Sequence, residues 1–453
     1  MLAVLSDLHF SETQSSQIGD LSFNTNLPVE TYQAYLSEIN QIALANQIKK
    51  VELVLAGDIL EISRSAFWLD GDERPYQDNH MISPGSSTEA VILKIIEKIA
   101  NEERVTETLA LFKDIQSFFN VDVQLHYILG NHDRLVNATP MIRTKTRNLF
   151  GLPGGDALFE HYFLFRDASD MPFCLVRHGH EYDPMNFSID THAFSLIPTM
   201  FPEKAYGSAS LGDITTIEFG AALPRYFVEE YGETAILQDV TMTAVYERLV
   251  GFDDVRPTTA LLAYLFSTPG VKKKKTWQLM KPCFERVINA LSDNELFMKG
   301  ISLSSTLRKS QRLLLNGILS SDLLKHGAPY WMVKQLMKRV SQKIKLSSQA
   351  KWAKRETLIK DNDSGCKCVI SGHSHFPEVS LLSAEKGDER YYINTGTWRN
   401  MIPATENFKD FGRLEAMTKV IIFQPHEKSN PDDELTWSFH YLSGVSYGSY
   451  RHL

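Results

Sequence analysis

The stretch YILGNHDRL occupies residues 127–135 and changes character halfway through. Its first half is an apolar run typical of a β-strand, and a glycine ends that run. An amide, an imidazole, a carboxylate and a guanidinium then follow one another at Asn131, His132, Asp133 and Arg134. Groups of these kinds can bind a metal ion, move a proton or hold a phosphate. Because a turn of this composition is common by itself, its meaning depends on whether matching groups follow other strands.

The composition is that of an ordinary globular protein. Of the 453 residues, 43% are hydrophobic and 23% are charged, which is enough apolar material for a large buried core. No run of about 18 apolar residues occurs, so we expect no membrane-spanning segment. The first residues, MLAVLSDLHF, look like a strand and not like a secretion signal. The four cysteines are too few for a disulfide framework, and we therefore expect a reduced, cytoplasmic protein.

Apolar runs typical of strands recur along the chain, and helical patterns lie between several of them. Strands that alternate with helices indicate an α/β architecture. The runs are LAVLS (2–6), VELVLAG (51–57), VQLHYILG (123–130), PFCLVRHG (172–179), CVISGH (368–373), YYINTG (391–396) and KVIIFQP (419–425).

Residues 185–360 have a different texture, because strand-like runs become rare and segments such as 311–324 and 330–346 show helical spacing. We interpret this part as a large helical insertion that forms a cap on an α/β domain made of residues 1–184 and 361–453. Residues 271–360 contain 20 Lys and Arg against five Asp and Glu, although the whole chain has a net charge of −8. A basic segment of this kind suits a polyanionic substrate or an anionic surface, and the plainer alternative is a solvated helix face.

Polar residues of metal-binding types follow five of the apolar runs. In an open α/β sheet, the carboxyl ends of the strands form the binding crevice, so these residues are expected to converge. Residues two apart in an extended chain also point to the same side. Any one of them could be a turn or capping residue, and the prediction rests on the set. The set is Asp7, His9, Asp58, Asn131, His132, His178, His180, His373 and His375.

The order D-x-H, G-D, G-N-H-D, H-G-H and G-H-S-H resembles that of the calcineurin-like metallophosphoesterase family. The resemblance covers residues 1–184 and about 361–453. It implies a sandwich of two β-sheets flanked by helices, with two metal ions at strand ends. It further implies that Asp58 bridges both ions and that His132 is catalytic without binding metal. The implied ligands are Asp7, His9 and His375 for one ion, and Asn131, His178 and His373 for the other.

The chemistry of the ligands agrees with this assignment. Four imidazoles with three carboxylate or amide groups and no thiolate favour Mn²⁺, with Fe or Zn²⁺ as alternatives. A dinuclear site lowers the pKa of bound water towards about 7 and attracts an anionic phosphate. We therefore expect in-line attack of a metal-bound hydroxide on phosphorus. His132 would protonate the leaving group or stabilise the transferring phosphoryl group.

Two further residues are candidates for binding the substrate. Arg134 could reach a phosphate oxygen, and a surface salt bridge is the alternative. His180 could contact the substrate or support the ligands from behind.

These observations predict a metal-dependent phosphohydrolase that acts on a phosphorylated small molecule. A first alternative is a membrane-associated pyrophosphatase that acts on a lipid-linked or nucleotide-sugar diphosphate and contacts the membrane peripherally through its basic cap. A second alternative is a binding or scaffold protein without catalysis, although no ligand is missing. We do not expect a nucleic-acid partner, because the basic segment shows no regular interleaving of aromatic residues.

Overall fold

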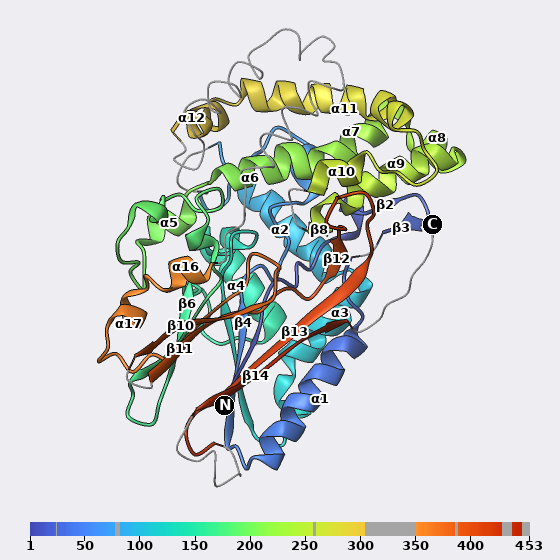
Figure 1. The fold of residues 1–453 in the computed structure, drawn as a ribbon. Coiled ribbons are helices and arrows are strands. Elements are labelled where there is room, and N and C mark those ends of the chain that lie inside the picture. The colour runs from blue at the N-terminus through green and yellow to red at the C-terminus, as the bar shows by residue number, and fades with distance from the viewer. Residues whose placement is uncertain are drawn as a thin grey trace.

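A computed structural model describes residues 1–23, 25–77, 82–256, 260–303, 349–385, 388–427 and 437–445 of the chain. Figure 1 shows a mixed α/β architecture, as the sequence predicted. All seven predicted apolar runs form strands. Residues 311–324 and 330–346, for which helices were predicted, lie outside the described residues.

The larger sheet has seven described strands in the order β5-β4-β1-β13-β12-β8, and β14 pairs with β13. β1, β4 and β5 run parallel to one another, and β13 is antiparallel to β1. The strands are β1 (Leu2–Leu5), β4 (Lys50–Ala56), β5 (Asp122–Ile128), β8 (Val255–Arg256), β12 (Asn400–Pro403), β13 (Leu414–Phe423) and β14 (Ser438–Val445).

The second sheet has five described strands in the order β10-β11-β9-β7-β6, of which β11, β9 and β7 are parallel. They are β6 (Tyr162–Arg166), β7 (Pro172–Arg177), β9 (Cys368–Ser371), β10 (Glu378–Glu385) and β11 (Asp388–Asn394). A small hairpin joins β2 (Gln17–Ile18) to β3 (Leu21–Ser22).

One buried apolar cluster joins the two sheets. Because side chains alternate along a strand, alternate buried residues of β1, β4 and β9 enter this cluster, and the buried residues between them belong to other core clusters. The larger sheet contributes Leu2, Val4, Val54, Ala56 and Ile128, and the second sheet contributes Phe173, Cys174, Val176, Cys368, Ile370 and Ile393.

Four helices from the first part of the chain contribute to the main core cluster. In α1, the buried residues Tyr32, Tyr35, Leu36 and Ile39 recur at helical spacing, so this amphipathic face packs inward. In α4, a proline lies at the first position and the left-handed Gly151 (φ 66°) ends the helix. The helices are α1 (Val29–Ala45), α2 (Ser87–Ala100), α3 (Glu103–Lys113) and α4 (Pro140–Phe150).

The described parts of the predicted insertion are mainly helical. Figure 1 shows most of their helices gathered at one end of the sheets, opposite the N-terminus. The α-helices are α5 (Glu203–Gly207), α6 (Leu211–Thr215), α7 (Ala222–Tyr231), α8 (Glu233–Gln238), α9 (Val240–Gly251), α10 (Leu261–Leu265), α11 (Lys273–Asp293), α12 (Glu295–Leu303), α16 (Ala350–Ala353) and α17 (Thr357–Lys360). Shorter helical segments are η1 (Thr13–Ser15), η2 (Ala66–Leu69), η3 (Ile115–Phe118), η4 (Arg134–Asn137), η5 (His180–Tyr182), η6 (Thr191–Ala193), the π-helical η7 (Thr216–Ala221) and η8 (Phe252–Asp254).

The insertion shares its core with the α/β part. Apolar residues of α7, α9 and α11, such as Phe227, Leu249 and Phe284, belong to the same buried cluster as Leu5 and Leu8. The insertion also supplies the short strand β8, which the sequence analysis missed and which pairs with β12. No helix in the described ranges is long and apolar enough to cross a membrane.

A buried group of charges ties the end of the insertion to β7. The Arg177 guanidinium lies 3.3 Å from the Glu356 carboxylate, and the Tyr182 hydroxyl donates to the same carboxylate at 2.6 Å. Arg177 and Glu356 have no solvent exposure. Burial outweighs the attraction of Arg177 and raises the pKa of Glu356 to about 7.

This raised pKa predicts a pH-dependent stability. Glu356 binds its proton more tightly in the folded chain than in the unfolded chain, where its pKa is near 4.5, so the free energy of unfolding falls as the pH rises from about 5 to about 8. Glu356→Gln removes this titration. Denaturant unfolding measures the free energy of unfolding at each pH. Over that interval we expect the wild type to lose about 2 kcal/mol more of this free energy than the variant loses.

Glu97→Gln is the matched control, because Glu97 is exposed on α2 and pairs with Lys145 across the surface. It should follow the wild-type pH profile. A Glu356→Gln profile parallel to wild type would show that Glu356 stays ionised in the folded protein.

Candidate metal centre

An unusual backbone conformation marks most of the predicted ligands. Left-handed φ angles are uncommon outside glycine and carry a conformational cost. Nine non-glycine residues of the described chain have positive φ, and five of them are Asp7 (55°), His9 (47°), Asp58 (54°), His373 (67°) and His375 (56°). The sequence analysis assumed an extended chain at residues two apart, and the positive φ angles at Asp7, His9, His373 and His375 correct this assumption. Asp7 and His9 do point together, as expected. The chain turns sharply after the strands, and the turn aims these side chains.

Asp7, His9 and His375 form the first group that could hold a metal ion. His375 Nε2 lies 3.2 Å from Asp7 Oδ1 and 2.9 Å from His9 Nε2. All three residues are buried. Two imidazole nitrogens this close, together beside one carboxylate, make a donor set that suits a divalent cation.

Asp58, His178 and His373 form the second group. His178 Nε2 lies 3.0 Å from Asp58 Oδ2 and 3.2 Å from Asn131 Oδ1, so Asn131 joins this group. The same Asp58 oxygen lies 3.8 Å from His9 Nε2 in the first group. Asp58 thus stands between the two groups, and the seven residues predicted as ligands lie together in one place.

The charges of the site reinforce this arrangement. Burial alone would raise the pKa of Asp58, but His178 and His132 outweigh it and hold the pKa well below its ordinary value. Burial likewise opposes the charge of His178, and the Asp58 carboxylate raises the pKa of this imidazole to about 10. The ionised Asp58 carboxylate suits a divalent ion, and an ion that binds His178 would displace the proton of this imidazole, because only a neutral ring is a ligand. With that exchange the residues present fit such ions.

Glu61 is a central residue that the sequence analysis missed. Its carboxylate lies 2.7 Å from Nδ1 of His9 and 2.5 Å from Nδ1 of His132. Burial opposes the charge of His132, but Glu61 and Asp58 together raise its pKa to about 10. Glu61 therefore fixes the orientation of both rings. Its place three residues after Asp58 in GDILE is the only local signal for it.

Asp133 shapes the turn that carries Asn131 and His132. Its carboxylate accepts hydrogen bonds from the Tyr127 hydroxyl at 2.7 Å and from the Gly130 amide at 2.6 Å. These contacts fix the turn that places Asn131 and His132.

Asp183 is a second residue that the sequence analysis missed. Its Oδ2 lies 3.1 Å from Nε2 of His373, so it orients this ring from the loop after His178.

Arg134 contacts the insertion and none of the candidate ligands. Its Nε donates to Asp213 at 2.7 Å, and Nη1 donates to the Gly207 carbonyl at 3.1 Å. The salt bridge expected at the surface is buried, because Arg134 is only 8% exposed.

His180 lies beside the second group of ligands. Its ring centroid is 5.4 Å from that of His178. Its buried Nδ1 lies 3.5 Å from the Glu181 carboxylate and forms no hydrogen bond within the described ranges. Burial lowers its pKa to about 3, so the ring is neutral.

Close packing explains two glycines of the motifs. A Cβ at Gly130 would lie 2.2 Å from an Asp58 oxygen, and a Cβ at Gly372 would lie 2.1 Å from an Asp7 oxygen. Neither carboxylate could keep its place beside a larger residue.

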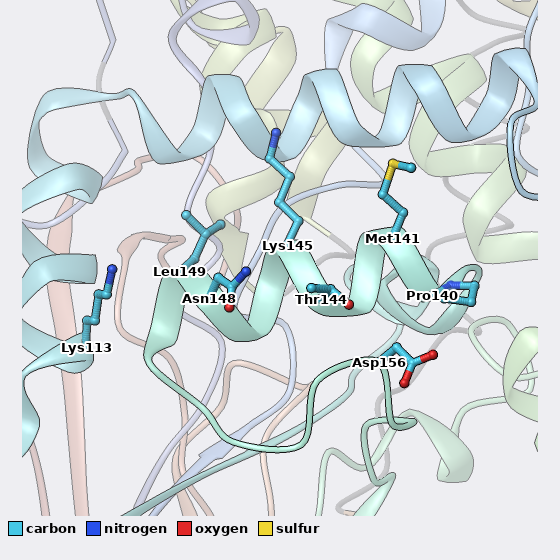
Figure 2. Close-up of a pocket in the computed structure, with 8 residues that line it drawn as sticks. All are labelled: Lys113, Pro140, Met141, Thr144, Lys145, Asn148, Leu149 and Asp156. Atoms are coloured by element: carbon cyan, nitrogen blue, oxygen red, sulfur yellow. The ribbon is translucent and has the colours of Figure 1, made fainter.

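The candidate centre is separate from a broad surface hollow of about 920 Å³ along α4. Figure 2 shows that Met141, Thr144 and Lys145, which line this hollow, project from α4. None of the candidate ligands lines the hollow, so it carries no part of the metal chemistry.

The chain matches no protein-family model, and comparisons with curated proteins and with solved structures give no significant match.

The position of Glu61 predicts an effect on metal binding. Glu61→Gln keeps the shape of the side chain but removes the charge that orients His9. Loss of such a supporting carboxylate lowers metal affinity by about 10–100-fold. Calorimetric titration with Mn²⁺ measures this change. Glu97→Gln on α2 is the control and should bind like wild type. Wild-type affinity in Glu61→Gln would show that the carboxylate does not support the ligand.

Proposed function

We propose that this chain is a metal-dependent phosphohydrolase of the metallophosphoesterase type, using two divalent ions of which Mn²⁺ is the first choice. The observation that carries the proposal is the position of Asp58 between two groups of ligands, each delivered by separate strand ends. Two sheets that share a buried core, with the site at strand ends, support the fold that the motifs suggest.

Asp7, His9 and His375 would hold one ion, Asn131, His178 and His373 the other, and Asp58 would touch both. Two such ions supply Lewis acidity towards phosphoryl oxygens and lower the pKa of bound water. Asp7 and Asp58 offset only part of the charge of two divalent ions, so the site attracts an anionic phosphate.

His132 would serve as the proton donor. Glu61 occupies its Nδ1, which leaves Nε2 to carry a proton towards the substrate. In the metal-free site Glu61 and Asp58 raise the pKa of His132, which favours a protonated ring that could donate to a leaving oxygen.

Cysteine chemistry offers no competing mechanism. Cys174, Cys283, Cys366 and Cys368 are all buried. Burial raises the pKa of the Cys174 thiol well above its ordinary value and that of Cys283 to about 12. A protonated, enclosed thiol is a poor nucleophile.

Metal removal is the direct test of the proposal. Purified protein should hydrolyse a phosphoester, lose the activity to a chelator and regain it best with Mn²⁺. Asp58→Ala should abolish turnover and lower the metal content below two ions per chain, measured by elemental mass spectrometry. Chelator-resistant activity, or a protein that takes up no metal, would refute the proposal.

His132→Ala separates proton transfer from metal binding. This variant should keep its full metal content and lose about 10²–10⁴ in kcat, the range for a general acid. The loss should be small for nitrophenyl esters, whose leaving group needs no proton, and large for alkyl or sugar esters. An equal loss on both substrate types would assign His132 to phosphoryl stabilisation, and a lost ion would place it among the ligands.

A further inference from the structure

The strand β8 brings one arginine of the insertion into the sheet that carries the candidate centre. Val255 pairs with Ile402, and Arg256 pairs with Pro403. The Arg256 carbonyl also accepts a hydrogen bond from the Ala404 amide at 3.0 Å. The backbone of Arg256 is therefore anchored in the sheet, although a cap helix was expected in this part of the sequence.

The Arg256 side chain reaches the candidate ligands. Its Nη2 lies 2.5 Å from Nδ1 of His375, the ring whose Nε2 lies 3.2 Å from Asp7. Its Nη1 donates to the backbone carbonyls of Asp253 and Val255 at 2.7 and 3.0 Å. Its Nε is buried and has no hydrogen-bond partner among the residues that the structure describes. Nη1 is thus held by the backbone, and Nη2 reaches the centre.

The charge of Arg256 is not neutralised by a direct ion pair. The buried arginines Arg134, Arg177 and Arg399 each face a carboxylate, at 2.7, 3.3 and 2.6 Å. Within the part of the chain that the structure describes, no carboxylate oxygen lies within 4.0 Å of the Arg256 guanidinium. Two acidic residues lie just before Arg256 in the sequence, and each forms a salt bridge with another arginine. Asp253 pairs with Arg64, and Asp254 pairs with Arg399.

The contact with His375 would not persist in a metal-loaded site. A neutral imidazole that binds an ion through Nε2 carries its proton on Nδ1, which then cannot accept a hydrogen bond from a guanidinium. Loading of the site would therefore release Nη2 of Arg256 at the edge of the centre. A guanidinium presents its N–H groups as a planar fork that matches two oxygens of a phosphate.

We propose that Arg256 is the substrate-binding arginine of this centre and holds oxygens of the phosphoryl group. The proposal rests on the proposed phosphohydrolase function and assigns part of the substrate site to the insertion. Arg256 thus takes the role that the sequence analysis gave to Arg134, whose guanidinium binds Asp213 and the Gly207 carbonyl.

Binding of inorganic phosphate tests Arg256 without any need for turnover. Wild type, Arg256→Met and Arg256→Lys are titrated with phosphate by calorimetry after Mn²⁺ loading, and the metal content of each is measured. We expect Arg256→Met to keep two ions and to bind phosphate about 10–100-fold more weakly, as loss of a charge-assisted contact implies. Arg256→Lys should recover part of the affinity, because it restores the charge without the fork.

Arg286→Met is the matched control, since Arg286 also belongs to the insertion but pairs with Glu229 on the surface of α7 and α11. It should bind phosphate like wild type.

Several outcomes would overturn the assignment. They are equal phosphate affinity in Arg256→Met and wild type, no phosphate binding by the wild type, and loss of an ion from Arg256→Met. If the wild type binds phosphate through Arg256 but hydrolyses no phosphoester, the proposed function fails and the binding role of Arg256 stands. If hydrolysis is normal and Arg256→Met binds phosphate normally, the function stands and this inference fails.

Discussion

The Asp58 carboxylate is the group on which the rest of the centre depends. It is 1% exposed, so its charge is tolerable only if partners replace the lost water. His178 lies 3.0 Å from one oxygen, and the His132 amide donates to the other at 2.8 Å. These partners come from the ends of β7 and β5. The left-handed turn at Asp58 and the close approach of Gly130 both serve this contact.

The local signals of the sequence predicted much of this structure. Each apolar run became a strand, and the polar residues after five of them meet, because the carboxyl ends of neighbouring strands share one edge. Glu61 was missed because its meaning depends on His9 and His132, which lie 52 and 71 residues away along the chain. Asp183 was missed for the same reason. Its role becomes visible only when the loop after β7 meets the loop after β9.

Hydrophobic periodicity in the sequence does not reveal every element of the insertion. A strand of two residues, Val255–Arg256, has no detectable alternation, and its partner β12 lies about 150 residues further along the chain. For Arg134 the sequence suggested a role that its contacts do not support. Its place beside His132 suggested the substrate, but sequence adjacency does not set the direction of a long side chain, and Asp213 of α6 supplies a buried partner.

The insertion and the centre are better described as one cooperative unit than as a domain with an added cover. Asp254 of η8 holds Arg399 at 2.6 Å, and Arg399 lies 3.9 Å from the Glu61 carboxylate that orients His9 and His132. The insertion side chains also complete the main apolar core. Removing the insertion would take away the Asp254 partner of Arg399 and would leave this guanidinium without it beside Glu61. The charge balance of the centre therefore depends on residues that fold against it from the middle of the chain.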